Sequence, residues 1–125
     1  MTIELSFCKM VFSENYVICS INEGETITAE KSNLQTEVIL DHYRDNPFIY
    51  ITHRIHSYSV DPSIYSETSK IETLVGFVVV SSSKSSVKNA LFEKMFLNKP
   101  FEIFEDIEDA VLWADTICNM KRELK

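Results

Sequence analysis

Histidine and acidic side chains that offer acid–base or metal-ligating chemistry lie close together near the middle of the chain. His53 and His56 are followed by Asp61, and imidazole titrates near neutral pH. Their spacing matches no metal-ligand pattern. Structural zinc also recruits four side chains and catalytic zinc three, and no third ligand is evident here. We therefore expect no metal and no cofactor. A hydrolase-like enzyme that uses these three residues is the last of three alternatives for the function.

The same segment contains several serines, which indicate either phosphate binding or phosphorylation. Ser57, Ser59 and Ser63 precede or open a predicted short helix, whose free amides and positive dipole end favour an anionic group. Arg54 is placed to add charge-assisted hydrogen bonds. The three serines are therefore candidate phosphosites. The alternative is that Ser59 and Asp61 act only as turn and capping residues.

A second group of serines, over residues 81–86, precedes the next predicted helix. The candidate anion-binding residues there are Ser82, Ser83, Lys84 and Ser85. Hydroxyl groups and helix-terminal amides converge on a small volume in such a loop, although serine-rich loops commonly do no more than start a helix. Glycine occurs only at Gly24 and Gly76, which excludes the glycine-rich loops that cradle phosphate in nucleotide-binding proteins.

The helix predicted after this loop has an unusually broad apolar arc. Its apolar residues are Val87, Leu91, Phe92, Met95 and Phe96. They cover about half of the circumference at 100° per residue, whereas packing on a sheet needs about a third. Phe92 and Phe96 are therefore candidates for contact with a pocket, a neighbouring helix or a second subunit. The alternative is burial around Pro100 and Phe101, and a common patch with Leu112 would favour a homodimer.

Two apolar strands are predicted to position these groups. Residues 48–54 and 74–80 read as strands that run into the two polar segments, and residues 74–80 are apolar on both alternating faces. This pattern is typical of a strand covered by helices above and below, so we expect residues 74–80 in the middle of the sheet, beside the strand that begins at Phe48. Ligands of open α/β sheets collect where such strands end.

Hydrophobic periodicity and capping residues place the remaining elements. We predict strands over residues 4–12, 15–22, 48–54, 74–80 and 101–104, and helices from Thr28 to 43, from Asp61 to 69, from Ser85 or Ser86 to 97, and after Asp106. The fold class is α/β, with a mixed, mainly parallel sheet of about five strands and about four helices in the order ββαβαβαβα. We expect a single domain over residues 1–125.

Composition narrows the partners and the compartment. The formal charge of −7 repels polyanions, so we expect no nucleic acid as partner and no insertion into a membrane. The longest apolar run, residues 74–80, is far shorter than the roughly 20 residues that cross a bilayer. Three cysteines without paired spacing fit reduced thiols. With no visible signal peptide, we expect a cytoplasmic protein.

The order of elements resembles the SpoIIAA-like group of STAS-type domains. The resemblance rests also on residues 25–30, which lead into the first helix, on the apolar strand 74–80, and on the closing helix after residues 101–104. In STAS domains that antagonise anti-sigma factors, a serine or threonine in an Asp-Ser-Ser/Thr-Gly context is the phosphorylation switch. The corresponding residues here, 56–63, contain serines without that signature. Some SpoIIAA-like domains are grouped by fold with lipid-binding CRAL-TRIO domains.

The resemblance implies a non-catalytic regulatory or protein-interaction module, which is our preferred prediction. The partner is then a protein, or a second copy in a homodimer. The alternative is a carrier or sensor that binds a small apolar or anionic molecule, such as a lipid. The residues expected to contact the partner or ligand are His53, Arg54, His56, Ser57, Ser59, Asp61, Phe92 and Phe96.

Overall fold

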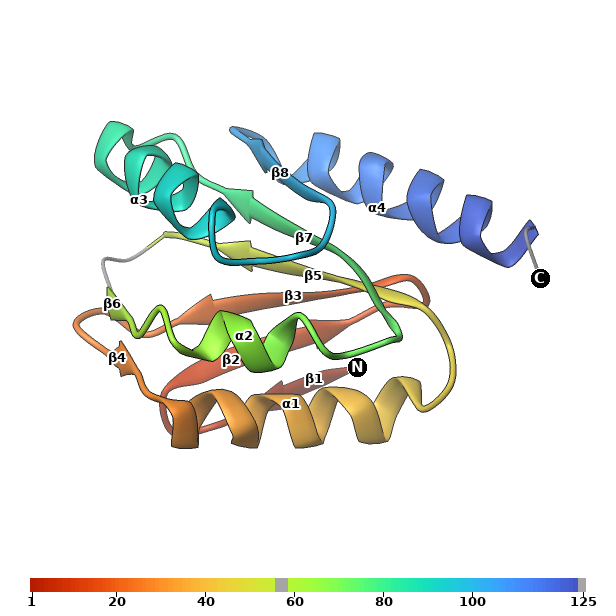
Figure 1. Cartoon of the computed structure of the whole chain (residues 1–125), viewed down its shortest axis with the longest axis horizontal. Coiled ribbons are helices and arrows are strands. Elements are labelled where there is room, and N and C mark those ends of the chain that lie inside the picture. Colours follow the sequence, from red (N-terminus) through yellow and green to blue (C-terminus); the bar gives the residue numbers. More distant parts are fainter. Residues whose placement is uncertain (56–58, 124–125) are drawn as a thin grey trace.

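A six-stranded sheet with helices on both faces forms the centre of the computed structural model, which describes residues 1–55 and 59–123 (Figure 1). The strands are β1 (Thr2–Glu4), β2 (Cys8–Phe12), β3 (Tyr16–Ile21), β4 (Thr26–Ile27), β5 (Phe48–His53), β6 (Ser59–Val60), β7 (Leu74–Val80) and β8 (Phe101–Phe104). The helices are α1 (Ala29–Tyr43), α2 (Ile64–Thr68), α3 (Lys84–Lys94) and α4 (Ile107–Glu123). The predicted α/β class is confirmed.

The strand order in the sheet is β1-β2-β3-β5-β7-β8. The first three strands are antiparallel neighbours, and β3, β5, β7 and β8 run parallel. The sheet has one strand more than expected because the predicted first strand, residues 4–12, corresponds to β2, and β1 precedes it as a separate strand that pairs with β2. A separate parallel pair, β4 and β6, was not predicted, since each has only two residues.

The interior position of β7 is confirmed, because β7 lies between β5 and β8 and is buried along nearly its whole length. On one face of the sheet, alternate residues of β5 and β7 such as Ile51 and Val78 pack against Ala110 and Ala114 of α4. Gly76 allows α4 to approach closely, since a Cβ atom there would lie 2.9 Å from the ring of Trp113. The small α4 residues and this glycine set a short distance between helix and sheet.

The opposite face of the sheet carries the other three helices. Ile39 and Tyr43 of α1 pack over β2, β3 and the start of β5. Tyr65 of α2 and Ala90 of α3 pack with Phe77 and Val79 of β7 and with Phe101 of β8. The ring of Phe77 stacks on that of Phe101, with centroids 5.3 Å apart. The two layers of helices therefore contact different side chains of the same central strands.

The helix starts differ in how well capping residues predicted them. Thr28 caps α1 as expected, since its side chain accepts a hydrogen bond from the amide of Lys31. The expected cap of α3 at Ser85 or Ser86 is wrong, because Ser83 accepts the hydrogen bond of the Ser86 amide and the helix begins two or three residues earlier than expected. The expected start at Asp61 is also early: α2 begins at Ile64, after a turn.

Candidate functional site

The two strands that lead into the expected polar segments end side by side in the structure. β5 and β7 are parallel and leave the sheet at the same edge. The amide of Arg54, just after β5, donates to the carbonyl of Val80 at 2.9 Å. Ser81, just after β7, donates its amide to the carbonyl of Phe104 at 3.0 Å. His56 and Ser57 lie outside the described residues.

A buried ion pair joins this sheet edge to α3. The guanidinium of Arg54 donates to both carboxylate oxygens of Glu93, each at 2.6 Å. The hydroxyl of Tyr65, from α2, donates to the same carboxylate. The side chains of Arg54 and Glu93 are only 6% and 10% exposed. The carboxylate on α3 thus ties together three elements, and we call these three residues the α3 anchor.

Sequence reasoning assigned Arg54 to an external anion and missed its real partner. Glu93 lies within a helix whose large apolar residues are on a different side from it. The spacing of Ala90, Glu93 and Leu97, at i, i+3 and i+7, is the signal that marks the buried side of this helix. An acidic residue on such a stripe needs a buried cation, and Arg54 at the end of β5 provides it.

Four of the five residues in the predicted apolar arc of α3 face away from the sheet, and the fifth, Val87, is half-buried. Leu91, Phe92, Met95 and Phe96 are 55%, 54%, 79% and 45% exposed, and we call these four residues the α3 apolar face. Met95 follows the helix but keeps helical backbone angles, and the rings of Phe92 and Phe96 lie 5.1 Å apart in an edge-to-face arrangement. The alternative of burial near Phe101 is therefore wrong, because Phe101 stacks on Phe77 instead.

Leu112 does not extend the α3 apolar face. It is 69% exposed on α4, and α4 covers the opposite face of the sheet from α3. Leu112 therefore cannot join Phe92 and Phe96 in the single patch that would have favoured a homodimer.

A cavity lies between α1, α2 and the sheet, and the α3 anchor borders it. Its volume is about 60 Å³, and most of its lining is apolar, including Ile39, Phe48 and Leu74. The side chains of Arg54 and Tyr65 also line it. An engineered cavity that binds benzene has about 150 Å³, so the space in this conformation is smaller than a single aromatic ring requires.

The residues proposed for acid–base chemistry do not converge where the structure describes them. His53 pairs in register with Val80, whose side chain packs on the α4 face of the sheet. Asp61 lies before α2, on the other face, where its exposed carboxylate accepts the Ser63 amide at 3.0 Å. That hydrogen bond lowers the pKa of Asp61. Across residues 1–55 and 59–123, no three potential metal-ligating side chains gather.

The serine sites have different positions. Ser59 lies in β6 and Ser63 is exposed just before α2; both stay predicted phosphosites.

In the second serine loop, residues 81–86, the amide of Ser83 donates to the side chain of Ser81 at 3.2 Å. Ser83 also caps α3 and lies 3.2 Å from the hydroxyl of Ser85. Ser82 and Lys84 are exposed beside this cap. The anion-binding role of this loop stays a prediction.

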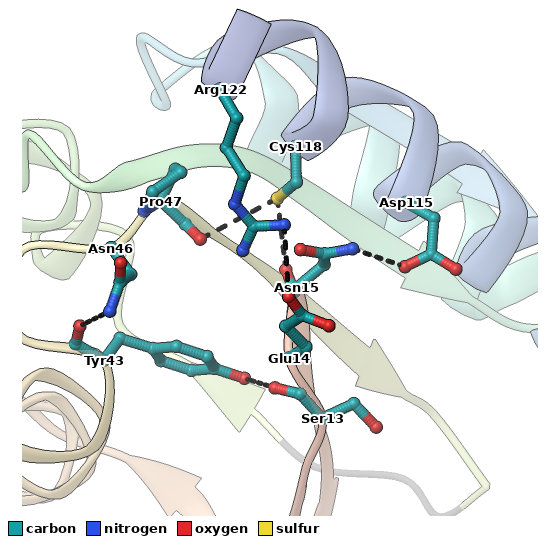
Figure 2. Close-up of polar contacts among 9 residues, drawn as sticks. All are labelled: Ser13, Glu14, Asn15, Tyr43, Asn46, Pro47, Asp115, Cys118 and Arg122. Carbon is teal, nitrogen blue, oxygen red and sulfur yellow. Dashed lines mark hydrogen bonds and ion pairs between the residues drawn. The ribbon is translucent and has the colours of Figure 1, made fainter. Parts of the chain in front are cut away.

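A second polar cluster, which sequence reasoning missed, ties α4 to the turn between β2 and β3 (Figure 2). Asn15 donates its side-chain amide to Asp115 at 2.9 Å, and the thiol of Cys118 donates to the Asn15 carbonyl at 3.2 Å. Arg122 lies 3.7 Å from Glu14. Burial raises the pKa of the Cys118 thiol to about 11, against a smaller opposite effect of Arg122. A protonated thiol is a poor nucleophile, which indicates a structural role.

Comparison with known proteins identifies the fold. No family model matches the chain, and no curated protein matches it in sequence. The crystal structure of an uncharacterised DUF3478 protein from Shewanella loihica PV-4 is similar, with a TM-score of 0.61 and 13% sequence identity. The similarity covers 91% of this chain and 98% of that one, whose fold is described as SpoIIAA-like. Within the described residues, no helix is long and apolar enough to cross a bilayer. As the order of elements predicted, this chain has a SpoIIAA-like fold.

Proposed function

We propose that this protein is a regulatory module that binds another protein, and that the α3 apolar face is its docking surface. The observation that carries the proposal is the exposure of four large apolar side chains within residues 91–96. Contiguous apolar patches of this kind mark interaction sites, whereas isolated apolar residues such as Leu112 are ordinary. Aromatic residues and methionine are also enriched at protein interfaces.

The α3 anchor supports this function because it fixes the docking helix in place. The bidentate contact of Glu93 with Arg54 and the contact with Tyr65 hold the inner side of α3 against the fold. A surface that is held rigidly loses less conformational entropy when a partner binds. The outer side chains of α3 are thus presented in a fixed register.

The cavity supports the carrier alternative less well. Its volume of about 60 Å³ is well below the roughly 300 Å³ at which small-molecule pockets begin. A ligand of that class could enter this cavity only if α1 or α2 moved. The interaction module needs no such rearrangement, and for that reason we prefer it.

Site-specific photocrosslinking tests the docking surface. A benzoylphenylalanine placed at position 92 should give a discrete adduct in a lysate of the cells that make the protein. The matched position is 112, which is similarly exposed but lies on the opposite layer of helices. The partner identified in the adduct, once purified, should bind the wild-type chain. Phe92→Ser should weaken the affinity of this chain for that partner at least about tenfold, as for a central apolar contact. Leu112→Ser should leave the affinity unchanged.

Two results would contradict the proposal. Equal crosslinking from positions 92 and 112 would show that the α3 apolar face has no special role. An adduct with twice the mass of this chain, and no other, would mean that the face joins two copies, as in the homodimer alternative.

A further inference from the structure

Positive charge is concentrated on the helix that carries the α3 apolar face. Residues 84–99 contain four lysines and one acidic residue, so this segment has a formal charge of +3 and the rest of the chain −10. The one acidic residue, Glu93, is buried and neutralised by Arg54. One third of the basic residues of an acidic protein therefore lie in this short segment.

Three of these lysines flank the α3 apolar face. Because a helix turns by about 100° per residue, Lys84 and Lys88 lie on the same side of α3 as Met95, nearer the N-terminus. Lys94 follows Leu91 by three residues and borders it. All three lysines are exposed, and within the described part of the chain none of them has an ion-pair partner. Lys99 differs, since it donates to the carbonyl of Ile71.

We propose that the partner docks through an acidic amphipathic segment, with apolar side chains that meet the α3 apolar face and carboxylates that meet Lys84, Lys88 and Lys94. The inference rests on the proposed function and adds the chemistry of the partner. Charge complementarity around an apolar centre selects partners and speeds association. Exposed lysines are suited to this role because they form the rim of the contact, where charges remain solvated.

A second copy of this chain fits the surface less well. Taking about 200 Å² for a large exposed side chain, the α3 apolar face offers on the order of 450 Å². A stable interface buries roughly 800 Å² on each partner. A symmetric dimer would have to supply the difference from the lysine rim, where both copies carry the same positive charge.

An anionic membrane is also less suitable than a protein segment. A membrane presents an extended negative surface, which would face the −10 remainder of the chain as well as α3. A narrow acidic segment contacts only the basic helix and avoids that repulsion.

A pair of matched synthetic peptides tests the proposal. Both are amphipathic helices of about 16 residues with leucine and phenylalanine on one face, and they carry either glutamate or lysine on the flanks. We expect the acidic peptide to bind the full chain at least about tenfold more tightly in fluorescence anisotropy at low salt, with a smaller ratio at high salt. Replacing Lys84, Lys88 and Lys94 together by glutamate should reverse the preference, and circular dichroism would verify that this variant folds.

The outcomes separate the proposal from the function on which it rests. Equal binding of both peptides that is lost in Phe92→Ser would overturn the acidic partner and leave the docking surface intact. Binding of neither peptide would count against both. The chain could instead sediment with vesicles containing phosphatidylserine, lose this binding in the lysine-to-glutamate variant, and bind neither peptide. That result would show that the helix binds a membrane and would overturn the proposal.

Discussion

Removing the charge of Glu93 should cost more stability than any exposed substitution in this protein. Glu93→Gln keeps the size of the side chain but removes the carboxylate charge that the Arg54 guanidinium contacts at 2.6 Å, in a site where the Arg54 side chain is only 6% exposed. Breaking a buried ion pair by removal of one partner costs about 3–5 kcal/mol. This is a large fraction of the roughly 5–15 kcal/mol by which domains are usually stable.

The individual contacts lead to a similar magnitude. The Glu93 carboxylate accepts two hydrogen bonds from Arg54 at 2.6 Å and one from Tyr65. A hydrogen bond to a charged group contributes about 1.5–3 kcal/mol, and such contributions in one network are not additive. A loss of about 4 kcal/mol should lower the melting temperature by roughly 10–20 °C in a chain of this size.

Urea unfolding followed by far-ultraviolet circular dichroism and by the fluorescence of Trp113 would measure the effect. The control is Glu67→Gln, which removes one partner of an exposed pair with Lys70, where the side chains are 71% and 69% exposed. That change should cost no more than about 0.5 kcal/mol. A double variant that combines Arg54→Met with Glu93→Leu should recover most of the loss, because apolar pairs often substitute for buried ion pairs.

Equal losses in the free energy of unfolding for Glu93→Gln and Glu67→Gln would refute the importance of the buried pair. A double variant that is no more stable than Glu93→Gln would also contradict it, since the loss would then not come from breaking the ion pair.

Three further predictions concern other parts of the fold. Gly76→Ala should cost about 1–3 kcal/mol in urea unfolding, because its Cβ would lie 2.5 Å from Ile49 and 2.9 Å from Trp113; an unchanged midpoint would refute the close approach of α4. Thr28→Ala should cost about 0.5–2 kcal/mol through loss of the α1 cap, and Thr28→Ser should restore most of it. Burial raises the pKa of Cys118 from its usual 9.0 to about 11. The stability that the buried, protonated thiol contributes is therefore fully present below pH 9 and is lost as the pH rises to about 11. In unfolding measured from about pH 8 to 11, Cys118→Ala should therefore lose less stability than the wild type, and parallel curves would speak against the shift.

Much of the fold could be predicted because local patterns and tertiary structure agree. The run of apolar residues in β7 is buried on both faces, as its composition predicts. Thr28 satisfies a free amide of α1, and the apolar stripe of α4 faces the sheet. The short pair β4 and β6 was missed because two residues carry no detectable periodicity.

The site was harder to predict because its central contact joins residues far apart in the chain. Arg54 and Glu93 are 39 positions apart, and nothing in the local sequence of either residue identifies the other as its partner. Sequence patterns assume that the apolar side of a helix faces the core. In α3 the inner side holds Ala90 and Glu93, while Phe92 points outward. The sequence therefore predicts the broad apolar arc of α3, but only the structure shows which side of the helix faces the sheet.

The two sides of α3 also have different freedom to evolve. Changes at Arg54, Tyr65 or Glu93 must be compensated together, so this side should drift slowly among related proteins. Residues such as Phe92 and Met95 have little influence on folding and can be exchanged one at a time. After gene duplication, one scaffold of this kind can acquire new binding preferences without passing through unstable intermediates.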